Sequence, residues 1–375
     1  MKYSFNNPKT YILVIACLLI IGAIYFLGYG NPIKNTSNGA LNVSPRISSE
    51  EKSKKYELAK EISTPDGFIN TDGKPITIGE LIGKKVILVD FWTYSCINCQ
   101  RTTPYLNSWY EKYKDRGLVI LGIHTPEFEF EKDYDNVKRA VEKFGIKYPV
   151  VLDNDYSTWT AYKNRYWPRK YLIDIDGYII YDHTGEGAYE ETEKKIQEAL
   201  TERMNSLAEI GTISEPLTKE TSLQNFSESP ETYFGASRNE FLGNGNKGFL
   251  GLQENLIIPS RVDSNILYLS GDWNIESEFA KNTSAPAGIT YTYRAKDVFF
   301  VAEAENEVIV EVLLDGKPIS IGAGEDIIKT TDGKTIIKVK EARLYKIIQG
   351  TKSEAHNLEF IIQKPGLKAF TFTFG

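Results

Sequence analysis

The pattern of apolar and polar positions divides the chain into an apolar run, two polar stretches and two longer segments with regular periods. Residues Tyr11 to Tyr29 carry no charge, and at about 1.5 Å of rise per residue they nearly span a bilayer core of roughly 30 Å. Lys2 and Lys9 precede the run, and positive residues favour the cytoplasmic side. We therefore predict a cytoplasmic N-terminus at 1–10 and a transmembrane helix at 11–29, with a cleaved signal peptide or lipidation at Cys17 as alternatives.

Two polar stretches are predicted to be linkers. Residues 30–62 are rich in Asn, Ser and Lys, and from 31 to 56 they show no sustained apolar period, which is typical of a flexible spacer. A second polar stretch begins at Gly211 and is assigned to 211–221. These linkers delimit two predicted domains, at 63–210 and 222–375.

The segment 63–210 alternates apolar runs of strand length with helical periods. Val86–Phe91 and Gly117–Ile123 are continuous apolar runs typical of buried strands. Between them, apolar residues recur at helical spacing up to Gly117, a residue type that commonly ends helices. Further strands are predicted at 148–152, 170–175 and 178–182, helices at about 137–144 and 189–207, and a hairpin at 68–78. The order predicts an α/β domain with a mixed sheet covered by helices.

The segment 222–375 reads as almost entirely strand. Short apolar or alternating runs recur between turn residues, at 273–279, 289–293, 298–302, 308–314, 344–348 and 369–374. This spacing predicts an all-β sandwich, of jelly-roll type. Trp273, Tyr268 and Tyr291 are candidates for stacking on sugar rings, although aromatic residues in alternating strands more often belong to the core.

Composition and charge exclude several function classes. The formal net charge is −6 and the isoelectric point is near 5.4, which argues against a nucleic-acid partner because phosphate binding needs concentrated Lys and Arg. The chain has three cysteines, too few for a disulfide framework or a four-cysteine zinc site. Neither a metal nor a bound cofactor is expected.

Two of the three cysteines form the motif Cys96-Ile97-Asn98-Cys99 where a predicted strand gives way to a helix. The first cysteine then faces the unpaired N–H groups and the positive dipole end of the helix, which favour the nucleophilic thiolate. A structural disulfide across four residues would close too small a loop to stabilise much. The motif therefore predicts a redox-active Cys96–Cys99 disulfide, in which one thiolate attacks and the other thiol resolves the mixed disulfide.

These residues resemble a known family. Val89-Asp90-Phe91-Trp92, the Cys-x-x-Cys motif and Pro104 are similar to the thioredoxin superfamily. The longer pieces WTYSCINCQRTTPYL, GIHTPEFEFEK, YKNRYWPRKYLID and GEGAYEETE resemble the thioredoxin-like part of DipZ proteins, relatives of the membrane-anchored TlpA and ResA oxidoreductases that serve cytochrome c maturation. SPETYFGASRNEF and the final AFTFTFG resemble the carbohydrate-binding-module-like C-terminal domain of DipZ. The resemblance implies a thioredoxin-like fold for 63–210.

The resemblance also implies roles for single residues. Cys96 is similar to the attacking cysteine, Cys99 to the buried resolving cysteine, and Pro168 to the family's cis-proline. Asp90 resembles the acid beneath the disulfide, and burial in an apolar strand should raise its pKa so that it can take the proton of Cys99. Ser95 occupies a position where many thioredoxins carry Trp, which puts a broad substrate range in doubt.

Four further residues are accessory candidates. Trp92 and Trp167 adjoin the motif residues, and His124 and Glu127 follow the strand that ends at Ile123. Active sites of open α/β sheets lie at the carboxyl ends of strands, so His124, Glu127 and nearby Glu129 could tune the thiols or contact a partner. Structural roles, as capping residues or as solvated surface residues, explain these three side chains equally well.

The leading hypothesis is a single-pass membrane protein with both domains outside the cytoplasm, acting as a thiol-disulfide oxidoreductase that reduces envelope proteins, apocytochrome c among them. The resemblance implies a CcdA-like membrane electron donor as partner, and the strand-rich domain could bind a cell-envelope glycan. The alternatives are a redoxin-type peroxidase, although Thr93-Tyr94-Ser95-Cys96 lacks the proline of that motif, and a glycan- or protein-binding envelope module with an accessory redox domain.

Overall fold

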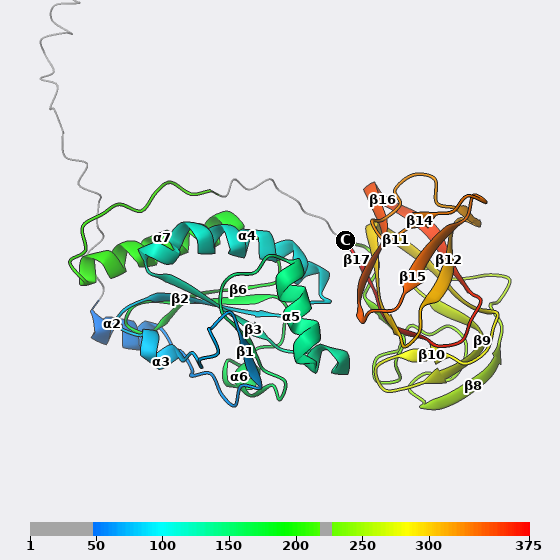
Figure 1. The fold of residues 1–375 in the computed structure, drawn as a ribbon, viewed down its shortest axis with the longest axis horizontal. Coiled ribbons are helices and arrows are strands. Elements are labelled where there is room, and N and C mark those ends of the chain that lie inside the picture. Colours follow the sequence, from blue (N-terminus) through cyan, green and yellow to red (C-terminus); the bar gives the residue numbers. More distant parts are fainter. Residues whose placement is uncertain (1–47, 218–226) are drawn as a thin grey trace, which may run out of the picture. The chain divides into compact units, whose positions relative to one another are not determined.

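The computed structural model describes residues 48–217 and 227–375 (Figure 1). Among these residues no helix combines the length and the apolar composition needed to cross a bilayer. The predicted anchor at 11–29 lies outside the described residues, as does the predicted linker up to residue 47.

The first part of the described chain is an α/β domain built on a six-stranded sheet with the order β1-β4-β3-β2-β5-β6. The central strand β2 runs parallel to β3 and antiparallel to β5, so the sheet is mixed, as the sequence predicts. The strands are β1 (Gly67–Ile69), β2 (Val86–Trp92), β3 (Leu118–His124), β4 (Val150–Leu152), β5 (Arg169–Ile173) and β6 (Ile179–Thr184). The helices are α2 (Ser49–Lys55), α3 (Ile78–Leu81), α4 (Ile97–Tyr113), η1 (Lys114–Arg116), η2 (Glu129–Lys132), α5 (Tyr134–Lys143), α6 (Ser157–Ala161) and α7 (Tyr189–Ser206).

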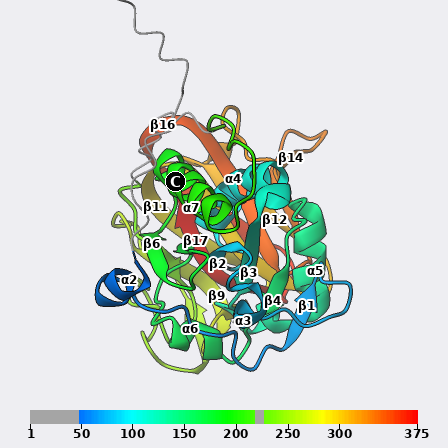
Figure 2. The same ribbon diagram turned by 90° about the vertical axis from the view of Figure 1, so that its left-hand side faces the viewer.

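Every residue of β2 is buried because helices cover both faces of the sheet. Side chains alternate along a strand, so Val86 and Leu88 join the core shared with α4, α5 and α7. Ile87 and Val89 join the opposite core with α3 and α6. Figures 1 and 2 show α4 and α7 on one face of the sheet and α3 and α6 on the other. A continuous apolar run thus marks a strand at the centre of a layered domain.

Two local predictions for this domain are wrong. The expected hairpin at 68–78 does not form, because β1 pairs with β4, about eighty residues away, with Phe68 opposite Val151. The predicted linker 30–62 is ordered from Ser49 onward, where α2 begins with Ser48 as its N-cap. Lys52 on α2 is buried and forms ion pairs with carboxylates of the α/β domain. These partners are distant in sequence, so no local sequence pattern predicts that α2 packs against the domain.

The residues after α7 follow the surface of the same domain. The carbonyl of Ser214 accepts a hydrogen bond from Gln197, and that of Glu215 accepts one from Lys112. The described part of the predicted linker 211–221 is therefore held against the domain, and residues 218–221 lie outside the described residues.

The second part, residues 227–375, is β-rich. Its strands join one hydrogen-bonded sheet in the order β14-β15-β12-β16-β11-β17-β10-β9-β8, with β13 paired to β12 and β7 to β17. They are β7 (Thr232–Tyr233), β8 (Gly251–Leu256), β9 (Leu267–Ile275), β10 (Ala280–Asn282), β11 (Ala287–Ala304), β12 (Val308–Leu314), β13 (Lys317–Pro318), β14 (Ile328–Lys329), β15 (Thr335–Val339), β16 (Arg343–Ile362) and β17 (Leu367–Phe374). Register shifts interrupt the pairing of the long strands β11 and β16, and the sheet encloses a single large apolar core. The jelly-roll topology stays a prediction.

An apolar cluster joins the two parts. Ile97 and Phe128 of the α/β domain pack with Phe299, Val301 and other residues of the β-rich region. Ile97 follows Cys96 directly and is 6% exposed. The β-rich region therefore covers an apolar side chain beside the Cys-x-x-Cys motif.

Candidate functional site

The Cys-x-x-Cys motif lies where β2 ends and α4 begins. Cys96 is the N-cap residue of α4, and its Sγ accepts a hydrogen bond from the backbone N–H of Cys99 over 3.4 Å. Cys96 is partly exposed, Cys99 is buried, and neither is in a disulfide. An accessible thiol at a helix N-terminus backed by a buried thiol is arranged for attack by the first and resolution by the second.

The loop before β5 lies against the first cysteine. The Trp167–Pro168 peptide bond is cis, as the resemblance implies. The Cys96 thiol faces the carbonyl oxygen of Trp167 at 4.0 Å, and the Trp167 indole N–H donates to the carbonyl of Thr125 over 3.0 Å. The loop before β5 thus contacts both Cys96 and the loop after β3.

Asp90 and Lys170 form a buried charged pair in the sheet beneath the motif. They lie opposite each other in the antiparallel pairing of β2 with β5, and both are almost fully buried. Burial raises the pKa of Asp90 to about 7, although the positive charge of Lys170 opposes the shift. Burial lowers the pKa of Lys170, whose Nζ donates to the carbonyl of Gly185 over 3.1 Å. Asp90 can therefore exchange a proton near neutral pH.

The Cys99 thiol is kept protonated. Burial raises the pKa of Cys99 well above its usual value, and the hydrogen bond with Cys96 and the negative charge of Asp90 act in the same direction. For Cys99 to act as a nucleophile, a base must take its proton. Asp90, whose pKa lies near neutrality, is the buried carboxylate that acts electrostatically on this thiol.

Trp92 and His124 pair side by side in β2 and β3, with their rings edge to face at 5.0 Å between centroids. His124 is fully buried, and burial lowers its pKa to about 3, so the imidazole is neutral. Its Nε2 lies 3.4 Å from the hydroxyl of Thr93. Trp92 packs in the same apolar cluster as Cys99, and His124 packs against the ring of Trp92.

The described partners of Glu127 and Glu129 are not the cysteines. A carboxylate oxygen of Glu127 accepts hydrogen bonds from Tyr233 and from Arg238, both in the β-rich region, at 2.9 and 2.8 Å. The side chain of Glu129 is largely exposed and pairs with Lys132. Glu127 therefore joins the two parts of the chain.

Sequence reasoning missed two buried charged residues of this site. Lys170 lies in a strand of mostly apolar residues. A lysine in such a strand indicates a buried ammonium group that needs a polar or charged partner. Glu131 is 0% exposed and contacts the loop before Cys96, yet the segment EFEFEK reads as a solvated acidic turn. Only the tertiary fold distinguishes Glu131 from its exposed neighbour Glu129.

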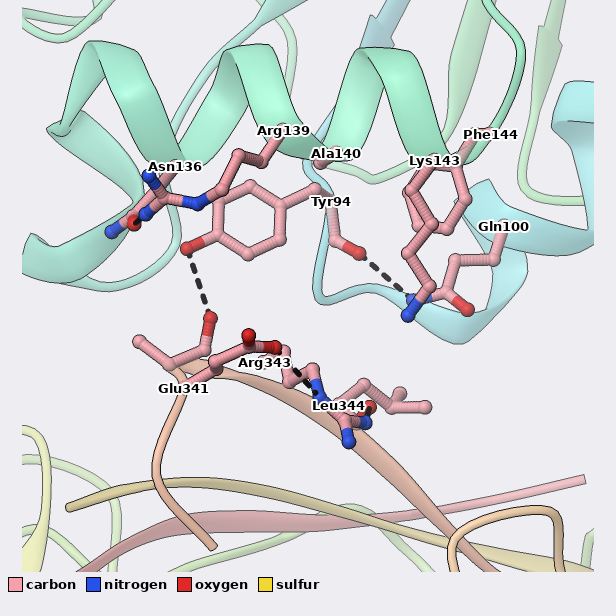
Figure 3. Close-up of a pocket in the computed structure, with 11 residues that line it drawn as sticks. Tyr94, Gln100, Asn136, Arg139, Ala140, Lys143, Phe144, Glu341, Arg343 and Leu344 are labelled. Carbon is pink, nitrogen blue, oxygen red and sulfur yellow. Dashed lines mark hydrogen bonds and ion pairs between the residues drawn. The ribbon is translucent and has the colours of Figure 1, made fainter. Parts of the chain in front are cut away.

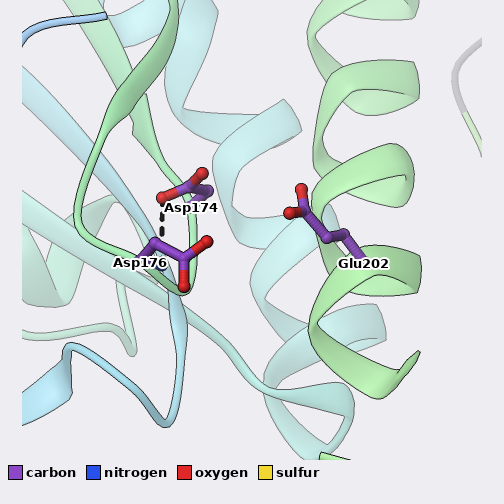
Figure 4. Close-up of side chains that lie close together, drawn as sticks. All are labelled: Asp174, Asp176 and Glu202. Carbon is purple, nitrogen blue, oxygen red and sulfur yellow. Dashed lines mark hydrogen bonds between the residues drawn. The ribbon is translucent and has the colours of Figure 1, made fainter. Parts of the chain in front are cut away.

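A separate acidic cluster brings together Asp174, Asp176 and Glu202 (Figure 4). Each carboxylate lies within 2.7 Å of the Nζ atom of Lys52. The lysine ammonium occupies the position that a cation would take among three carboxylates. The cluster is therefore an attachment point for α2.

A cavity of about 130 Å³ lies beside the loop before Cys96, between α5 and residues 341–344 (Figure 3). The Tyr94 hydroxyl donates to the carbonyl of Ala342 over 3.2 Å, and the Tyr94 carbonyl accepts from Gln100 over 2.9 Å. Neither Cys96 nor Cys99 lines this cavity. It is distinct from the thiol site.

The aromatic candidates for sugar stacking lie in the core of the β-rich region. Trp273 and Tyr291 are fully buried, and Tyr268 is nearly so. The indole N–H of Trp273 donates to the carbonyl of Ser270, and the hydroxyl of Tyr291 pairs with Thr232. Their role is packing, so any glycan would need a different surface.

A dithiol at a strand-to-helix junction, a neighbouring cis-proline and a buried acid on a mixed sheet define a thioredoxin-like dithiol protein. Comparison with known families agrees: a Redoxin model matches residues 54–200, and a model described as Thioredoxin like C-terminal domain matches 229–375.

Curated relatives identify the family. Thiol-disulfide oxidoreductase YkuV of Bacillus subtilis is 30% identical over 127 residues, which cover 34% of this chain and 85% of YkuV. ResA of Bacillus thuringiensis is 33% identical over 141 residues, covering 37% of this chain and 76% of ResA. Protein DipZ of Mycobacterium tuberculosis is 36% identical over 321 residues, or 84% of this chain and 43% of DipZ. The chain belongs to the thioredoxin-like family of thiol-disulfide oxidoreductases, and it spans less than half the length of DipZ.

Proposed function

We propose that this protein is a membrane-anchored, extracytoplasmic thiol-disulfide oxidoreductase that reduces disulfides in envelope proteins. The observation that carries the proposal is the partly exposed Cys96 at the N-terminus of α4, backed by buried Cys99 and by Asp90. The apolar run at 11–29 supports the anchor, and similarity to DipZ and ResA supports the thiol-disulfide chemistry.

The reaction has two displacement steps. The Cys96 thiolate attacks one sulfur of a substrate disulfide, a mixed disulfide forms, and the other substrate sulfur leaves as a thiolate that takes a proton. Cys99 then gives up its proton and attacks Cys96 Sγ. This breaks the mixed disulfide, releases the second substrate thiolate and leaves a Cys96–Cys99 disulfide. The substrate gains two electrons and the protein loses two.

Asp90 supplies the base for the second step. Because its pKa is raised to about 7 by burial, a substantial fraction is ionised at neutral pH and can accept the proton of Cys99. Lys170, opposite Asp90 in the sheet, stabilises the charged form. The carbonyl of Trp167 lies 4.0 Å from the Cys96 thiol, which supports binding of an incoming substrate chain along this backbone.

Continued turnover needs a donor of two electrons. Outside the cytoplasm the surroundings are oxidising, so the electrons must cross the membrane, and a CcdA-like membrane protein fits this role. Disulfide-containing envelope proteins, with apocytochrome c among them, are the proposed substrates.

Covalent trapping tests the proposal. In the Cys99→Ser variant, Cys96 still attacks the partner, but no second thiol can break the mixed disulfide. The physiological partner therefore remains attached to Cys96 through a reducible disulfide bond. Cys96→Ser is the matched control and should trap nothing. The reduction potential of the wild-type pair tests direction: a value near −270 mV, that of thioredoxin, fits a reductant, whereas one near −120 mV, that of a disulfide-forming enzyme, contradicts it.

A further inference from the structure

Glu131 is a fully buried carboxylate in the loop that follows β3, and the reaction above does not use it. It lies in η2, and its side chain reaches the loop that precedes Cys96. Within residues 48–217 and 227–375 it forms no ion pair. A buried carboxylate with no cationic partner is costly, so its contacts are informative.

The two carboxylate oxygens of Glu131 hold different loops. Oε1 accepts hydrogen bonds from the hydroxyl and the backbone N–H of Ser95, at 2.6 and 3.2 Å. Oε2 accepts from the backbone N–H groups of Glu127 and Phe128, at 2.6 and 3.1 Å. One side chain thus ties the residue before Cys96 to the loop after β3. That loop also carries Thr125, whose carbonyl accepts from Trp167.

The pKa of Glu131 and the charged groups around it determine when this carboxyl group is ionised. Burial raises the pKa of Glu131 to about 6, whereas the bonds from Ser95 and Thr93 oppose that shift. Glu131 is therefore mostly ionised at pH 7 and mostly protonated at pH 4.5. The titratable and charged groups around it are Tyr94 before Cys96, His124 at the end of β3, Glu127 on its own loop, Arg238 bound to Glu127, Tyr156 before α6, and Arg139 on α5, which faces Tyr94.

We propose that Glu131 is a positioning residue that fixes the loop before Cys96. Its negative charge is held on Ser95, the residue that precedes Cys96, and biases the dithiol toward donating electrons. An anion near a thiol disfavours the ionised thiolate form. A dithiol protein whose reduced form is stabilised acts as an oxidant. An anion that destabilises the thiolate of the reduced form therefore makes the pair a stronger reductant. The inference rests on the proposed redox function of the same pair.

The test is the rate at which iodoacetamide alkylates Cys96 in the reduced full-length chain, followed by mass spectrometry of the Cys96 peptide. Glu131→Gln keeps the size of the side chain and removes its charge. We expect it to react about three- to tenfold faster than wild type at pH 7. At pH 4.5 the two rates should converge, because Glu131 is then protonated in the wild type too. A tenfold shift in the thiol-disulfide equilibrium toward the reduced protein, about 30 mV, should accompany the change.

Two variants separate charge from structure. Glu129→Gln removes an equal but exposed charge two residues away and should react like wild type. Ser95→Ala removes the hydroxyl donor and keeps the carboxylate charge, so it should react no faster than wild type, even if Glu131→Gln fails to fold.

Three outcomes overturn the proposal: equal rates for wild type and folded Glu131→Gln at pH 7, a rate difference that is constant from pH 4.5 to 7, or acceleration in Ser95→Ala. Alkylation needs no redox partner. A failed trapping experiment would therefore reject the proposed function without deciding the role of Glu131.

Discussion

At the scale of single residues, burial decides which groups of the site can exchange protons. His124 has a pKa lowered to about 3 by burial, so it stays neutral at physiological pH. Asp90 has a pKa raised to about 7 by burial and changes charge within that range. The carboxylate, and not the histidine, is therefore the group that can assist Cys99.

The raised pKa of Asp90 has a measurable cost in stability. The folded chain holds the Asp90 proton up to about pH 7, whereas the unfolded chain releases it near the ordinary aspartate pKa of 3.8. The folded state then binds more protons between these values, and stability falls as pH rises through this window. We expect Asp90→Asn to raise the free energy of unfolding by about 2–4 kcal/mol at pH 8 and by less at pH 5. Urea unfolding at both pH values measures this, and an equal gain at each would contradict it.

Asp90→Asn should also slow the resolving step. Loss of a general base typically costs about 10²-fold or more, so the mixed disulfide on Cys96 should persist longer while its formation is little changed. Quenched-flow trapping with a model disulfide separates the two steps. Slowing of the first step alone would show that Asp90 acts on Cys96 instead.

At the scale of elements, the sequence predicts what depends on local pattern. The runs at 86–91 and 117–123 correspond to β2 and β3, and Gly117 ends the helical stretch with a φ of 100°. The failed predictions involve partners distant in sequence: β1 pairs with β4 instead of forming a hairpin. Glu131 and Lys170 were missed for the same reason, because only long-range packing shows that these charges are buried.

The helix α2 illustrates such a distant partner. Lys52 is 2% exposed and bridges carboxylates on the β5–β6 turn and on α7. Removing one member of a buried charge cluster leaves the others uncompensated. We expect Lys52→Met to destabilise the chain by about 3 kcal/mol and to make residues 48–62 sensitive to protease. Lys54→Met is the control, because Lys54 is exposed and its helical pair with Glu50 is worth little. If Lys52→Met resists protease cleavage as well as the wild type does, the expectation is contradicted.

At the scale of the whole molecule, the β-rich region shapes the surroundings of the thiol. Glu127 binds Tyr233 and Arg238, and Arg101 on the active-site helix pairs with Asp297 at 3.3 Å. Ile97 is buried in the shared apolar cluster. Ile97 is therefore not available as an apolar docking surface for a folded protein.

A substitution at Phe370 tests whether the apolar cluster that buries Ile97 limits access to Cys96. Its ring lies 5.1 Å from that of Phe128 and 4.8 Å from that of Phe130, between centroids, in the cluster that buries Ile97. Phe370→Ala should cost about 3 kcal/mol of stability through the cavity it leaves and expose apolar surface beside Cys96. We expect the rate with a folded disulfide protein to rise several-fold relative to the rate with oxidised glutathione, which needs no docking surface. Phe249→Ala, at a side chain 68% exposed, should leave the ratio unchanged. If Phe370→Ala also leaves it unchanged, the β-rich region does not limit substrate access, and its contacts serve stability alone.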